Sequence, residues 1–284
     1  MLNENSLVLC GATIGSVSFE DLITAASSGG FDAISLMAVF YEEALSRGLS
    51  IQDMQLMLND NGLVIAEVDA LLSWLPGASP NEDASEYEKD SYSKNEELFF
   101  EMAGAFGARS MNIAQAWGPE ISIAKVSEAF ASLCERALLH DLFVSLEFLP
   151  WSGISNLNAA FKIIETANQP NGGLMIDTWH HHRAEGKTED LLQIPGEKII
   201  STQINGVLRK PWDNMVEETL SARLLPGEGE NDVVGFIKNL DKIHSKAPIG
   251  VEIFSKELSK LPVVEIGKTV GHAVSETVDK ARKL

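Results

Sequence analysis

The chain has 284 residues, of which 45% are hydrophobic and 22% charged, and its formal net charge is −19. A chain of this length can bury a sizeable core without disulfides, and Cys10 and Cys134 both lie in apolar segments that suggest buried thiols. The acidic balance and the lack of any cluster of lysines and arginines argue against a nucleic-acid partner. With no basic N-terminal region and no run of about 18 apolar residues, we expect a cytoplasmic protein that has no membrane partner.

Eight short apolar runs recur along the chain. Near-continuous apolar runs are typical of strands that are buried on both faces. They cover residues 7–14, 31–37, 63–72, 110–117, 142–150, 173–179, 199–206 and 249–254. Several of the stretches between them repeat apolar residues at helical spacing, which predicts amphipathic helices. These stretches are 18–30, 50–62, 93–108, 122–140, 156–168 and 231–243.

Strand–helix alternation repeated eight times predicts an α/β fold, a (β/α)8 TIM barrel that forms a single domain over residues 1–284. A doubly wound sheet is the alternative, and the absence of a glycine-rich dinucleotide turn disfavours it. Three segments interrupt the alternation and are expected to be loops: 73–94, 150–156 and 206–232. All three leave the carboxyl ends of strands, where such barrels hold their sites. The chain after residue 255 is expected to form the last helix.

Four of the expected strands end on oxygen-bearing side chains: Glu147, Asp177, Gln203 and Glu252. Carboxylates at such places are costly without a partner, and three of them facing one barrel mouth would repel one another. A bound divalent cation would resolve that repulsion. The oxygen-rich set suits Mn²⁺, Mg²⁺ or Co²⁺, with Zn²⁺ also possible. The alternative is that each carboxylate caps a helix or pairs with a lysine, but no basic residue lies within three positions of Glu147.

Three histidines follow Asp177 directly after Thr178 and Trp179. His180 lies three residues beyond Asp177, within reach of a ligand that is held at the strand end. His181 and His182 are instead expected to point into the following loop and to pair with acidic residues such as Glu185.

Arginines and tryptophans near the strand ends are further candidates for ligand binding. Arg209 and Arg223 lie in the segment 206–232, and either could clamp a phosphate or carboxylate, although an ordinary surface arginine is the alternative for each. Tryptophans at or just past strand ends suggest pocket walls for a cyclic or sugar-like ligand, with core packing as the alternative. They are Trp74, Trp117, Trp151 and Trp179.

The segments SLEF, IDTWH, LPGEGE and VEIF, with Gln203 between the second and the third, resemble the xylose isomerase-like TIM-barrel superfamily. This group of sugar-phosphate isomerase and epimerase proteins also includes inosose dehydratase and 3-dehydroshikimate dehydratase, and endonuclease IV is a relative. The resemblance covers essentially the whole chain. It implies metal ligation, acid and base roles for two of the ligands, and contacts to substrate. The implied metal ligands are Glu147, Asp177, Gln203 and Glu252, the implied acid and base are Glu147 and Glu252, and the implied substrate contacts are His180 and Arg209.

Two positions depart from the ketose 3-epimerases of that group. Their third metal ligand is a histidine, where this chain has Gln203, and a further glutamate of theirs corresponds to Gly153. Both departures favour the dehydratase branch. The extra histidines of endonuclease IV are not recognisable, in agreement with the acidic charge.

Three functions follow from these features. The first is a divalent-metal-dependent isomerase or epimerase that acts on a sugar or ketose-like polyol, by removing a proton next to a metal-polarised carbonyl to form an enediolate. Either glutamate could be the base. The second is a metal-dependent lyase of the 3-dehydroshikimate or inosose dehydratase type, or a 3-oxo-glycoside eliminase. The third is a non-catalytic sugar-binding barrel. All three imply a small-molecule sugar, polyol or cyclic hydroxy-keto partner, and the helical outer face permits a homo-oligomer.

Overall fold

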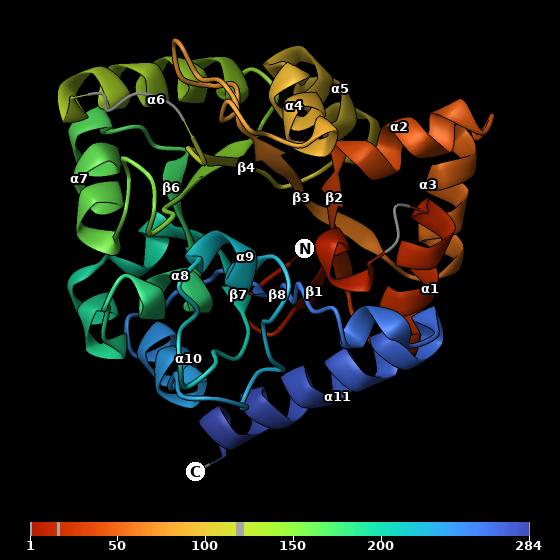
Figure 1. Cartoon of the computed structure of the whole chain (residues 1–284). Coiled ribbons are helices and arrows are strands. Elements are labelled where there is room, and N and C mark those ends of the chain that lie inside the picture. Colours follow the sequence, from red (N-terminus) through yellow and green to blue (C-terminus); the bar gives the residue numbers. More distant parts are fainter. Residues whose placement is uncertain (1, 16–17, 118–121, 284) are drawn as a thin grey trace.

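The computed structural model describes residues 2–15, 18–117 and 122–283. Within these ranges, eight parallel strands close into a barrel in which each strand pairs with the next and β8 pairs with β1 (Figure 1). The predicted (β/α)8 barrel is therefore confirmed. The strands are β1 (Leu7–Cys10), β2 (Ala33–Met37), β3 (Val64–Leu71), β4 (Ser110–Ala114), β5 (Phe143–Glu147), β6 (Gly172–Asp177), β7 (Ile199–Ile204) and β8 (Ile249–Val251).

The longer helices form an outer layer around the strands (Figure 1). The helices are α1 (Phe19–Gly29), α2 (Ala38–Ser46), α3 (Ile51–Asp60), α4 (Glu86–Ser93), α5 (Glu96–Phe106), α6 (Ile123–Leu138), α7 (Leu157–Ala167), α8 (Thr178–Arg183), α9 (Met215–Thr219), α10 (Val233–Lys242) and α11 (Val263–Arg282). In the part of the chain that the structure describes, no helix is both long enough and apolar enough to cross a membrane.

Local side-chain hydrogen bonds explain where several helices begin. The Ser18 side chain accepts from the backbone N–H of Asp21 at the start of α1. Ser50 and Asp53 form a reciprocal capping box at the start of α3. Such caps satisfy backbone N–H groups that have no partner inside the helix. The six predicted helices and the last helix after residue 255 are confirmed.

Two of the three expected loops contain helices, which corrects the sequence-based prediction. Segment 73–94 includes α4, and segment 206–232 includes the short α9. At α4, Ser85 and Glu88 form a capping box, and at α9 the Asn214 side chain accepts from the backbone N–H of Glu217. Neither helix has the broad apolar stripe that the prediction required. Their caps help to hold them, α9 also buries Glu218 and Thr219, and both helices follow the carboxyl ends of strands, β3 and β7.

The barrel interior is unusually polar toward the carboxyl ends of its strands. The Ser201 hydroxyl of β7 donates to Glu67 Oε2 of β3 at 2.6 Å, and these two strands are not neighbours in the barrel. Cys10 and Cys134 are both free and buried, as expected from their apolar surroundings.

Close contact between α1 and α11 depends on glycines at their interface. A Cβ atom built on Gly271 of α11 would overlap the carbonyl oxygen of Gly29 in α1, whereas one built on Gly104 of α5 would meet no atom within 4 Å. Both Gly271 and Gly104 are helical. Packing therefore requires a glycine at position 271 and does not require one at position 104.

We expect Gly271→Ala to lower the free energy of unfolding by about 1–3 kcal/mol, because the added methyl group forces the two helices apart. Gly104→Ala is the matched control, and it should raise stability by about 0.5–1 kcal/mol because alanine loses less entropy in a helix. Urea unfolding of both variants measures the difference. Equal stability of the two variants would contradict the packing argument.

Candidate active site at the barrel mouth

The four strand-end residues singled out in the sequence come together at the carboxyl end of the barrel. Glu147 ends β5, Asp177 ends β6, Gln203 lies in β7 and Glu252 directly follows β8, and all four are buried. In one orientation of the Gln203 amide, its nitrogen lies 3.3 Å from Asp177 Oδ2 and 3.2 Å from Glu252 Oε2. In the opposite orientation, its nitrogen lies 3.4 Å from Asp69 Oδ2. The strand ends thus form one acidic cluster.

Arg223 from segment 206–232 reaches into this cluster and is itself buried. Its Nη1 donates to Asp177 Oδ2 at 2.8 Å and to Glu252 Oε2 at 2.9 Å. Thr219 of α9 accepts from Nε and Nη2, and the guanidinium lies 5.7 Å from the centre of a Trp179 ring. A planar guanidinium held on all sides in this way joins two carboxylates that would otherwise repel each other.

Glu67 and Asp69 of β3 belong to the same interior, although the sequence analysis did not single them out. Asp69 Oδ1 accepts from Asn112 Nδ2 at 2.9 Å, and Asp69 Oδ2 accepts from the Ser35 hydroxyl at 3.1 Å. Asn112 Nδ2 also donates to Glu147 Oε2 at 2.9 Å, so it links the two carboxylates. The sequence carried a signal for both residues, because two carboxylates spaced by two in an apolar strand share one face.

His180 lies beside Glu147 and Arg223 in the same cluster. Its Nε2 is 3.5 Å from Glu147 Oε1 and 3.2 Å from Arg223 Nη2. Burial lowers the pKa of His180 to about 3, so the ring is neutral at physiological pH. Donation to Glu147 requires a proton on Nε2, whereas acceptance from Arg223 requires a bare Nε2. His180 therefore cannot neutralise Glu147, but it can adopt either tautomer next to it.

The interior holds more carboxylates than it can keep charged. Burial, followed by the charge of Glu252, raises the pKa of Glu147 well above its usual range. Burial also raises the pKa of Glu252 to about 7, although Arg223 opposes the rise, and raises the pKa of Glu67 to about 8 with help from Asp69. The excess negative charge must be met by protons or by a cation.

The donor groups of the cluster fit a hard divalent cation. One ligand atom each from Glu147, Asp177 and His180 lie within 4.8 Å of one another. With its nitrogen toward the cluster the Gln203 amide donates to Asp177 Oδ2 and Glu252 Oε2, and with its oxygen toward the cluster it offers one more ligand atom to a cation. Oxygen-rich sets of this kind suit Mn²⁺, Mg²⁺ or Co²⁺ and also accept Zn²⁺.

The structure does not bring every expected residue to the cluster. The Arg209 side chain is 88% exposed and forms a surface ion pair with Glu230, so Arg223 is the arginine from this segment that reaches the cluster. His181 lies inside α8, where its ring Nε2 is 2.8 Å from the carbonyl oxygen of Lys187, and it does not pair with Glu185 in the way expected.

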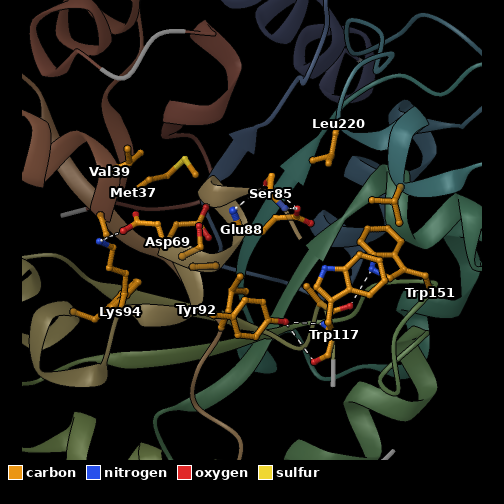
Figure 2. A pocket seen from close by; sticks show the side chains of 18 residues that line it. Met37, Val39, Asp69, Ser85, Glu88, Tyr92, Lys94, Trp117, Trp151 and Leu220 are labelled. Atoms are coloured by element: carbon orange, nitrogen blue, oxygen red, sulfur yellow. Dashed lines mark hydrogen bonds and ion pairs between the residues drawn. The ribbon is translucent and has the colours of Figure 1, made fainter. Parts of the chain in front are cut away.

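A cavity of about 300 Å³ adjoins the acidic cluster, and its lining includes residues of segments 73–94 and 206–232 (Figure 2). Asp69 lines one side, and Trp117 and Trp151 line another. Trp74 and Trp179 are instead buried in the protein interior. Two of the four tryptophans that the sequence placed near strand ends therefore wall a pocket, and two pack inside the fold.

The model of the xylose isomerase-like TIM-barrel family matches residues 23–275. The chain belongs to this family. Inosose isomerase from Bacillus subtilis (strain 168) is 27% identical over 155 residues, which are 54% of this chain and 55% of that protein. The 3-dehydroshikimate dehydratase from Pseudomonas aeruginosa is 26% identical over 140 residues, which are 49% of this chain and 22% of that protein. The chain thus spans about half the length of the first relative and less of the second.

Solved structures agree with the fold. The IOLI protein, solved with a bound zinc atom, has a TM-score of 0.83 and 21% sequence identity, and the match covers 98% of this chain and all of that one. The two sequence relatives named above are enzymes, an isomerase and a dehydratase. These likenesses support an enzyme of the same broad kind and leave its reaction to be argued from the site.

In metal-free protein, we expect the free energy of unfolding to fall as pH rises from about 4.5 to 8. In this range the folded state holds protons on Glu67 and Glu252 that the unfolded chain has already released. Urea unfolding at several pH values measures the slope. Glu67→Gln should flatten it, and Glu165→Gln, at an exposed glutamate of α7, is the control. Identical slopes in the wild type and Glu67→Gln would contradict this charge balance.

Proposed function

We propose that the protein is a divalent-metal-dependent isomerase or epimerase that acts on a sugar or ketose-like polyol. The observation that carries the proposal is a pair of buried glutamates with raised pKa values, Glu147 and Glu252, which flank Asp177 and Gln203 at one barrel mouth. Perturbed carboxylates that meet in a cleft are typical of acid–base catalysis. Inosose isomerase, among the relatives, supports the same class of substrate.

Glu147, Asp177, Gln203 and Glu252 are the proposed metal ligands. A divalent cation bound there supplies a Lewis acid that polarises the substrate carbonyl and an adjacent hydroxyl. Mn²⁺, Mg²⁺ and Co²⁺ suit the donor set, and the zinc atom in the IOLI protein supports Zn²⁺ as a further candidate. Arg223 holds Asp177 and Glu252 in fixed positions, which preserves the geometry of the ligands while substrate enters and leaves.

The two glutamates divide the proton transfers between them. One removes the proton from the carbon next to the carbonyl, and the other returns a proton to the opposite face or to the neighbouring carbon. Return to the opposite face gives an epimer, and return to the neighbouring carbon gives an isomer. His180 donates a hydrogen bond to a substrate oxygen, a role that suits a neutral ring beside Glu147.

A lyase of the 3-dehydroshikimate or inosose dehydratase type, or a 3-oxo-glycoside eliminase, is the second candidate. The residues that favour it are Gln203, in place of a histidine, and Gly153, where a Cβ would already meet Gln115 Oε1 at 2.9 Å. A larger acidic side chain at position 153 would have to displace Gln115. In this reaction one glutamate removes the same proton, and the other, in its protonated form, protonates the departing hydroxyl group, which leaves as water. The dehydratase from Pseudomonas aeruginosa supports this alternative.

Elemental analysis of the purified protein should find roughly one divalent ion per chain, because the four proposed ligands, Glu147, Asp177, Gln203 and Glu252, are proposed to hold a single cation. Asp177→Asn should lose the ion, since the substitution removes a charged ligand. Arg209→Ala is the control, since Arg209 lies on the surface. If the wild type takes up no Mn²⁺, Mg²⁺, Co²⁺ or Zn²⁺, the metal chemistry is wrong and the sugar-binding alternative gains support.

Glu147→Gln and Glu252→Gln should each lower kcat by about 10²–10⁴-fold on whichever inosose or ketose the wild type converts, because each removes a proton carrier. Deuterium from the solvent, followed by NMR at the carbon next to the carbonyl, reports the proton transfer directly. New conjugated ultraviolet absorbance would instead identify the lyase. If either variant keeps full activity, the glutamate that it replaces does not carry a proton in the reaction.

A further inference from the structure

The cavity beside the acidic cluster, called the side pocket below, is continuous with the proposed catalytic groups. Asp69, which contacts Gln203 in the cluster, is part of its wall. Trp151 lines it from another side, and the Trp151 ring lies edge-on to His180 with ring centres 5.4 Å apart. A molecule that is held at Glu147 and His180 can therefore extend one substituent into this space.

Most of the side pocket's surface is apolar. Figure 2 shows side chains from strand ends and from segment 73–94 that converge on the space, together with Leu220, which directly follows α9. Its volume of about 300 Å³ is roughly twice that of a protein cavity that binds benzene. The apolar lining includes Met37, Val39, Trp117, Trp151, Val216 and Leu220.

Carboxylates of Asp69, Glu88 and Asp90 line part of the wall, and several other polar atoms there already have partners. The Tyr92 hydroxyl accepts from the backbone N–H of Trp117 at 2.7 Å, and Trp151 Nε1 donates to the carbonyl oxygen of Ala116 at 3.1 Å. The Lys94 ammonium is paired with two carboxylates. The hydroxyl groups of a polyol would lose water here and gain little in exchange, whereas the faces of the two tryptophan rings remain available.

The walls are held in place by the protein itself. The Arg183 guanidinium donates to Glu218 Oε1 of α9 at 2.5 Å, and Glu218 Oε2 accepts from the backbone N–H of Trp212 at 2.7 Å. These contacts hold the helix that carries Val216 and precedes Leu220. Because the wall is already ordered, a ligand that enters the side pocket does not have to order it.

We infer that the side pocket receives a planar, apolar group, such as an aryl ring, that is joined to the hydroxy-keto part of the substrate. The inference rests on the proposed function and narrows its substrate class. A small polyol alone would fill the acidic cluster and leave the side pocket without suitable contacts. An aryl-substituted sugar would place its polar part at the carboxylates and its ring between Trp117, Trp151 and Leu220.

Isothermal titration of the full chain with phenyl 3-keto-β-D-glucopyranoside and methyl 3-keto-β-D-glucopyranoside tests this inference, because both carry the hydroxy-keto part and they differ in the aryl ring. We expect wild-type protein to bind the phenyl compound at least tenfold more tightly than the methyl compound. Leu220→Asp should weaken binding of the phenyl compound at least fivefold, and Val216→Asn should also weaken it. Leu56→Asp on α3 is the matched control, because Leu56 and Leu220 are both 52% exposed and Leu56 lies outside the side pocket.

Equal affinity of the wild type for the two compounds would overturn the inference. A preference for the phenyl compound that both Leu220→Asp and Val216→Asn leave intact would overturn it as well, because the ring would then bind elsewhere. Metal analysis of the same samples separates this result from the proposed function. If the protein lacks metal but prefers the phenyl compound, the side pocket inference stands and the proposed metal-dependent function does not. If the protein contains metal but shows no preference, the proposed function stands and the side pocket inference does not.

Discussion

The organisation of the barrel mouth depends on placing several carboxylates in a space that water barely reaches. A buried charge is stable only when it is paired or hydrogen-bonded. Arg223 meets this need for Asp177 and Glu252, and Asn112 bridges Asp69 and Glu147. Burial, and then the remaining excess charge, raises the pKa values of these carboxyl groups, and the same excess makes the site attractive to a divalent cation.

The need to pair these buried charges explains the role of the segments that lie outside the barrel. Arg223 is delivered by segment 206–232, and Thr219 of α9 in the same segment holds its guanidinium. Segment 73–94 contributes Ser85, Glu88 and Tyr92 to the lining of the side pocket (Figure 2). Segment 206–232 therefore balances the charge of the cluster through Arg223, and both segments shape the space next to it.

The family and the fold leave room for several reactions. The same groups at the barrel mouth suit isomerisation and elimination, since both reactions begin with the removal of a proton next to a carbonyl. Differences between them lie in single side chains, such as Gln203 and Gly153, and in what the neighbouring loops add. Chemistry on such barrels is decided by site residues, because the scaffold itself is shared by many reactions.

Much of this architecture was predictable from local pattern. Apolar runs at regular intervals identified the eight strands, and their polar last residues identified Glu147, Asp177, Gln203 and Glu252, because strand ends of a parallel barrel meet at one face. The roles of Arg223 and Arg209 could not be told apart in this way. One is buried between carboxylates and the other is exposed to solvent, a difference that depends on how α9 folds back over the mouth. Only tertiary structure decides such contacts, because residues distant in sequence must first be brought together.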